Sequence, residues 1–143
     1  YFMIPFLAEK RNLTVITNGI KTLTALSENN ISCIGTGGEV INSCLAFVGE
    51  EAHRTIERYN ADFCFFACRG ISEDGRLTDI SEPENSVRAK MLEHSKQAYM
   101  LCTSDKMNKL YYHNLCSADD ITGIIKAEAA DSCALQNPQL CIR

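Results

Sequence analysis

Apolar and polar positions follow one another in blocks that predict strands separated by helices. The predicted strands are short runs of apolar and β-branched residues, at 13–17, 31–35, 62–68, 98–103 and 121–127. Apolar residues at helical spacing predict helices at 1–8, 20–28, 50–59 and 82–97. Strands that alternate with helices indicate an α/β fold, with a mostly parallel open sheet and helices on both of its faces.

The run at 62–68 is apolar at almost every position. A strand with one solvated face alternates between apolar and polar residues, whereas a parallel strand covered by helices on both sides does not. We therefore predict that both faces of this strand are buried. The polar segment 69–81 that follows contains two glycines, and we predict a long loop there.

The first predicted helix has no capping residue before it, and Pro5 is tolerated only in a first turn. This pattern indicates a helix entered midway, so we expect the natural domain to begin upstream. No basic region precedes the apolar stretch and no small-residue cleavage site follows it, so we do not expect a signal peptide. The length of 143 residues suits a single domain over 1–143.

The composition argues against two classes of partner. The chain carries 14 Lys and Arg against 18 Asp and Glu, a net charge of −4, and has no dense basic run. Proteins that bind nucleic acid gain most of their affinity from cations on phosphates, so we do not expect this segment alone to bind DNA. No apolar run approaches the roughly 18 residues that span a bilayer.

Eight cysteines are unusual for a chain of this length. Most lie in or beside apolar runs, among them Cys33, Cys44, Cys64, Cys68, Cys102 and Cys116. A disulfide scaffold or a zinc site are the alternatives, but disulfide scaffolds are shorter, and Cys64 and Cys68 have no second pair to complete a zinc site. The pattern favours reduced core thiols of a cytoplasmic protein, with no metal and no cofactor.

Candidate chemistry lies where the predicted strands end, because ligands of open parallel sheets bind beyond the carboxyl ends of the strands. Glycines and amides at helix starts accept a phosphate readily, Arg69 and Lys106 add full charges, and Asp79 could hydrogen-bond sugar hydroxyls. The sequence thus predicts a site for a phosphorylated sugar or a similar small anion. The predicted effector-binding residues are Thr17, Asn18, Gly19, Gly37, Gly38, Arg69, Gly70, Asp79 and Lys106.

Each of these segments also has a purely structural interpretation. Residues 17–19 could be a helix cap, and 35–38 could be a simple turn. The latter fails the dinucleotide-binding pattern, because Val40 stands where a third glycine belongs. The three histidines are isolated in sequence and no nucleophile elbow is present, so we expect no catalytic residue.

Six segments follow one another at characteristic intervals, at residues 12–18, 37–38, 45–49, 60–62, 66–71 and 104–106. Together they resemble the DeoR family of transcription regulators, and the resemblance extends over 1–125. It implies a fold like that of ribose phosphate isomerases and CoA transferases, and a sensor domain that binds an effector without turning it over. It also implies a homo-oligomer that binds operator DNA through a helix-turn-helix outside this chain, usually as a repressor of sugar metabolism genes.

The chain departs from the family pattern at several positions. The acidic-Gly-hydroxyl loop of the family would lie before Tyr1. Thr103 stands where the family usually has Asp, and Arg88 where Lys is common. Arg69 replaces a small hydroxyl residue, and an arginine there could grip a second acid or phosphate with two hydrogen bonds.

Two other functions remain open at this point. A sugar-phosphate isomerase of the same fold needs a carboxylate base, and the candidates Glu73, Asp74 and Asp79 share one loop without an acid–base partner. A purely structural dimerisation module is the other alternative. The sequence favours the sensor over both.

Overall fold

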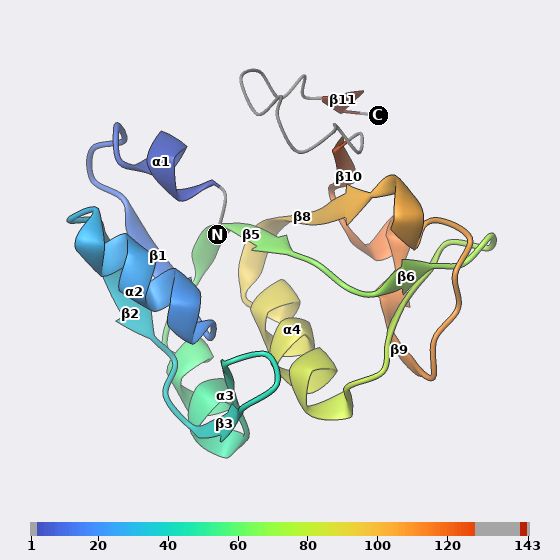
Figure 1. The fold of residues 1–143 in the computed structure, drawn as a ribbon, viewed down its shortest axis with the longest axis horizontal. Helices are drawn as coiled ribbons and strands as arrows, with labels where there is room; N and C mark the ends of the chain where they lie inside the picture. Colours follow the sequence, from blue (N-terminus) through green and yellow to red (C-terminus); the bar gives the residue numbers. More distant parts are fainter. Residues whose placement is uncertain (1–2, 128–140, 143) are drawn as a thin grey trace. The chain divides into compact units, whose positions relative to one another are not determined.

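A computed structural model describes residues 3–127 and 141–142 of the chain (Figure 1). These residues belong to two compact units, Tyr1–Tyr59 and Asn60–Arg143. The single domain expected from the sequence stays a prediction.

The first unit pairs a parallel two-stranded sheet with an antiparallel hairpin. Its elements are α1 (Ile4–Leu7), β1 (Thr14–Thr17), α2 (Ile20–Glu28), β2 (Ser32–Gly35), β3 (Glu39–Ile41), β4 (Ala46–Val48) and α3 (Glu50–Ile56). Strands β1 and β2 run parallel, in a register that sets Thr17 opposite Gly35. Ile4, Leu26 and Ile31 are buried together, which packs α1 and α2 against the start of β2. Helix α1 begins at Ile4, with Pro5 in its first turn and Met3 as its N-cap, so the prediction of a helix over 1–8 that is entered midway is wrong for the described residues, which exclude residues 1–2.

The second unit contains the longest strand and two sheets. Its elements are β5 (Ala61–Phe66), β6 (Gly70–Ile71), β7 (Arg76–Asp79), α4 (Glu82–Glu93), β8 (Ser95–Thr103), β9 (His113–Ser117), β10 (Gly123–Ala127) and β11 (Cys141–Ile142), with single 3-10 turns at Ser104–Lys106 and Ala118–Asp120. Strands β5, β8 and β10 are parallel neighbours, and β11 is antiparallel to β10. Strands β6, β7 and β9 form an antiparallel sheet. One apolar cluster, which includes Leu77 and Met100, packs these strands together.

The predicted α/β class is confirmed, and the five predicted strands correspond to β1, β2, β5, β8 and β10. The single, mostly parallel sheet is wrong for the described residues, whose strands pair in four separate sheets, two of them antiparallel. The predicted loop 69–81 is in part the hairpin β6–β7. Its turn needs a left-handed residue, which Gly75 supplies at φ 83°, and the buried Leu77 and Ile71 stabilise it from within.

Two other sequence predictions need correction. Strand β5 buries Cys64 and Phe66 on one face, but Phe63 and Phe65 on the other face are 57% and 44% exposed, so the strand is not buried on both sides. The helix predicted to reach residue 97 ends at Glu93 instead. Parallel pairing with β5 begins at Ser95, and these ladder hydrogen bonds outweigh the weak helical preference of a short polar stretch.

Candidate functional site

The end of β1 is tied to two neighbouring segments by its own polar groups. The Thr17 hydroxyl accepts the Gly19 amide at 3.1 Å, and the Thr17 carbonyl accepts the Thr36 amide at 3.1 Å. The Asn18 side-chain amide donates to the Phe47 carbonyl at 3.1 Å, while the Asn18 carbonyl accepts the Phe47 amide at 2.8 Å. The side chains of Thr17 and Asn18 therefore hold the start of α2 against β4. This is a structural role of the kind that the sequence offered as an alternative to effector binding.

Gly37 and Gly38 have different reasons to be glycine. Both have positive φ, 67° and 112°. A Cβ on Gly38 would lie 2.4 Å from the Val48 carbonyl oxygen, whereas a Cβ on Gly37 would meet nothing within 4 Å. The cavity beside Gly38, about 350 Å³, is lined by Glu39, Val48, Glu50 and Glu51. Carboxylates repel an anion there, so we expect an effector to reach this turn from Gly37.

Three of the predicted residues meet at one edge of a sheet in the second unit. Strands β5 and β8 run parallel with Phe66 opposite Met100, so both carboxyl ends lie at the same edge. Arg69 and Gly70 follow β5, and Lys106 closes the 3-10 turn after β8. The structure thus brings Arg69, Gly70 and Lys106 to the edge at which the sequence predicts anion binding.

Gly70 is a packing glycine. A Cβ at this position would lie 2.5 Å from the Lys109 carbonyl oxygen and 2.9 Å from the Tyr111 ring. The close approach lets the buried Thr78 hydroxyl accept the Tyr111 amide at 2.9 Å and donate to the Gly70 carbonyl at 3.4 Å. The segment that carries Lys106 is thereby held on the hairpin.

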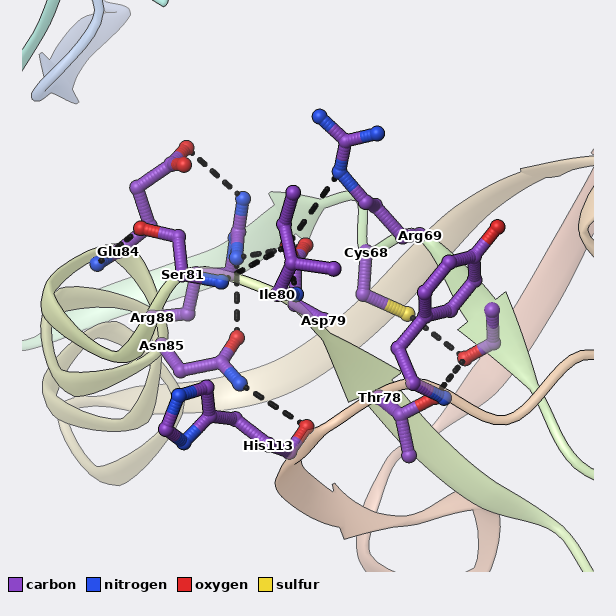
Figure 2. A network of polar contacts seen from close by, with 12 residues as sticks. Cys68, Arg69, Thr78, Asp79, Ile80, Ser81, Glu84, Asn85, Arg88 and His113 are labelled. Atoms are coloured by element: carbon purple, nitrogen blue, oxygen red, sulfur yellow. Dashed lines mark hydrogen bonds and ion pairs between the residues drawn. The ribbon is translucent and has the colours of Figure 1, made fainter.

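Asp79 lies at the centre of a polar network shown in Figure 2, and the residue is 2% exposed. Oδ1 accepts the backbone amides of Ile80 and Ser81 at 2.7 and 3.4 Å, and Oδ2 accepts Arg88 Nη1 at 3.0 Å. Arg69 Nε lies 3.7 Å from Oδ1. Both oxygens therefore have donors from the protein, and contact with sugar hydroxyls, which remains a prediction, would displace one of them.

Arg88 joins this carboxylate to helix α4. Its Nη1 also donates to Asn85 Oδ1 at 2.9 Å, and Nη2 donates to Glu84 Oε1 at 3.1 Å. Asn85 in turn donates to the His113 carbonyl at 3.4 Å, which links α4 to β9. Sequence reasoning did not assign these residues to the site. The i,i+4 spacing of Glu84 and Arg88 predicts the ion pair between these two residues. No local sequence pattern predicts the contact between Arg88 and Asp79.

The cysteine thiols that are buried or half-buried have low nucleophilicity. Burial raises the pKa of Cys64 to about 11, and burial is also the main reason that the pKa of Cys116 is raised to about 11. Burial likewise raises the pKa of Cys68 and Cys102, although the Lys106 charge opposes the rise at both. All six cysteines with described side chains are free, as predicted. A neutral thiol is a poor nucleophile, so none of these four is placed for covalent chemistry near neutral pH.

Two further features bear on the class of protein. Within the described residues, no three His, Cys, Asp or Glu side chains gather where they could hold a metal ion. None of the helices in that part of the chain has the length and apolar character needed to cross a membrane.

Comparison with known proteins identifies the class. The family model described as the DeoR C terminal sensor domain matches residues 1–128. The transcriptional regulator YulB of Bacillus subtilis is 30% identical over 125 residues, 87% of this chain and 48% of that protein. The L-fucose operon activator of Haemophilus influenzae is 32% identical over 112 residues, 78% and 45% of the two chains. The lactose phosphotransferase system repressor of Staphylococcus aureus is 26% identical over 128 residues, 85% and 51%.

The chain spans about half the length of the curated relatives it matches. These relatives are named as transcriptional regulators, and the matching model describes a sensor, so this is a regulatory domain and not an enzyme. The match runs through the ends of β1, β2, β5 and β8 that the geometry singles out. The chain belongs to the DeoR family, of which it is a C-terminal sensor domain.

Proposed function

We propose that this sensor domain binds a phosphorylated sugar, or a related small anionic metabolite, and transmits its presence to operator DNA. The observation that carries the proposal is the convergence of Arg69 and Lys106 at the carboxyl edge of the β5–β8 sheet, in a chain whose net charge is −4. Regulators named for fucose and lactose systems among the relatives support a sugar-derived effector.

The residues have distinct roles in this proposal. Lys106 holds the phosphate as a mobile point charge, and Gly70 keeps the chain beside Arg69 packed against the Lys109 backbone. Asp79 keeps Arg69 in place. Taken by itself, the first unit keeps its own predicted anion-binding residues, Thr17, Asn18, Gly19, Gly37 and Gly38, since amides at the start of α2 favour an anion.

Binding regulates by shifting a population. The effector binds one arrangement of a homo-oligomer more tightly than another, with a coupling free energy of about 1–3 kcal/mol. A helix-turn-helix outside this chain reads the operator DNA, and the protein acts in the cytoplasm.

The test is calorimetric titration of the full-length regulator with a panel of pentose, hexose and amino-sugar phosphates, each beside its unphosphorylated sugar. We expect saturable heat with at least one phosphorylated compound, weakened operator binding in its presence or strengthened binding if it is a co-repressor, and no turnover. Absence of heat across the whole panel contradicts the proposal. Turnover of a phosphopentose would instead revive the isomerase alternative.

A further inference from the structure

Arg69 is positioned with unusual firmness for an exposed arginine. Its backbone amide donates to the Thr78 carbonyl at 3.1 Å, and its neighbours Cys68 and Gly70 are both buried. Gly70 admits no shift, because the Lys109 backbone lies against it. The base of the side chain is therefore fixed at the carboxyl end of β5, and little backbone entropy is lost when the guanidinium binds a ligand.

The guanidinium of Arg69 has a described partner at Nε only. Nε lies 3.7 Å from Asp79 Oδ1, and the side chain is 58% exposed. Among the residues that the structure describes, neither terminal nitrogen of Arg69 has an acceptor, and Figure 2 shows both pointing away from the network. A guanidinium offers five N–H donors, so the outer pair remains available for a planar acid group.

The negative charge of Asp79 does not cancel Arg69. Its other oxygen is paired with Arg88 at 3.0 Å, a contact shorter than the one to Arg69, and two backbone amides share Oδ1. The carboxylate therefore orients Arg69 while much of its charge is balanced elsewhere. Arg69 keeps the capacity to attract an anion.

A second cation lies at the same sheet edge. Lys106 follows β8, the strand parallel to β5, so the two cations come from neighbouring strand ends of one unit. A single phosphate is held adequately by a point charge and backbone amides. Arg69 adds a second cation whose two terminal nitrogens remain available as donors. This arrangement fits a ligand that carries another acidic group.

We infer that the effector has two acidic groups, a phosphate and either a second phosphate or a carboxylate, and that Arg69 grips the second of them through its two terminal nitrogens. This inference rests on the proposed function and makes it more specific. Arg69 is then the residue that determines selectivity between effectors, while Lys106 supplies the affinity for phosphate that all of them share.

The test is calorimetric titration of the full-length regulator with two matched pairs of probes: fructose 1,6-bisphosphate beside fructose 6-phosphate, and 6-phosphogluconate beside glucose 6-phosphate. Wild type is expected to prefer the doubly acidic member of at least one pair by about tenfold or more. Arg69→Ser should reduce that preference to roughly twofold or less, because it weakens binding of the doubly acidic member far more than binding of the singly phosphorylated member. Arg69→Lys keeps the positive charge but loses the paired N–H donors of the guanidinium, so its preference for the doubly acidic member should lie between those of wild type and Arg69→Ser.

Arg76→Ser is the matched control, because it removes an exposed arginine of the same unit whose partner is Asp74. It should leave the preference unchanged. Equal binding of the singly and doubly acidic probes by wild type, or an Arg69→Ser variant that weakens both equally, overturns the inference while the proposed function stands. If no phosphorylated probe of any kind binds, the proposed function fails and this inference fails with it.

Discussion

Replacement of Arg88 by Met should lower the free energy of unfolding by about 3–5 kcal/mol, because it strands a buried carboxylate. Asp79 is 2% exposed, and Arg88 is its shortest ionic contact at 3.0 Å. Methionine retains much of the apolar stem but removes the donors to Asp79, Asn85 and Glu84 together. Two backbone amides remain on Oδ1 but do not neutralise the charge, and the exposed Arg69, 3.7 Å from the same oxygen, compensates for the loss of Arg88 only weakly. Urea denaturation followed by circular dichroism measures the loss.

Two companion variants separate charge burial from lost packing. Asp79→Asn in the Arg88→Met background removes the stranded charge while keeping an acceptor for the Ile80 amide, so we expect it to recover about 1–2 kcal/mol. Arg54→Met removes an exposed arginine, 56% accessible, from two surface ion pairs, and it should change stability by less than about 1 kcal/mol. If Arg88→Met were no more destabilising than Arg54→Met, the network would not be a structural element.

Replacement of Gly70 by Val should destabilise the protein by about 3 kcal/mol, and replacement by Ala by about 2 kcal/mol. A Cβ would lie 2.5 Å from the Lys109 carbonyl oxygen, a backbone atom that cannot rotate away. The strand end and the 109–111 segment must then separate, and the hydrogen bond from the Tyr111 amide to the Thr78 hydroxyl is lost with them. Thermal and urea unfolding of both variants provide the measurement.

Gly37→Ala is the control for the Gly70 variants. Gly37 has a left-handed φ of 67° but no atom within 4 Å of the added Cβ. Its substitution therefore isolates the backbone strain, about 1 kcal/mol, from steric overlap. A Gly70→Val variant as stable as Gly37→Ala would show that the 109–111 segment can move aside at little expense, contrary to the packing described above.

The five parallel strands were predictable because each contains a short run of apolar and β-branched residues, the side chains that favour strands. The hairpin β6–β7 was not predictable in this way. Its buried positions include Thr78 and Asp79, polar residues that hydropathy places in solvent. Distant partners complete the hydrogen bonding of both residues, namely the Tyr111 amide for the threonine and the Arg88 guanidinium for the aspartate.

In the candidate site, too, some features follow from the sequence and others do not. That Arg69 and Lys106 share an edge follows from strand direction alone, since adjacent parallel strands end on the same side. Which glycine accommodates another segment does not follow, because the Lys109 backbone against Gly70 is far away in sequence. The same limit applies to Asp79, for which the loop composition indicates a solvent-facing sugar contact and the coordinates show a saturated, buried carboxylate.

Lys106 should recognise a phosphate at the carboxyl edge of the β5–β8 sheet. Calorimetric titrations of the full-length regulator compare wild type, Lys106→Met and Lys96→Met, each with the sugar phosphate that binds most tightly and with the same sugar lacking phosphate. Lys96 lies near the opposite end of β8 and pairs with Asp62, so it controls for loss of one positive charge. We predict a roughly 10–100-fold weaker affinity of Lys106→Met for the phosphorylated sugar, near-wild-type affinity of Lys96→Met, and little effect of either on the unphosphorylated sugar. Wild-type affinity of Lys106→Met for the phosphorylated sugar would contradict the account.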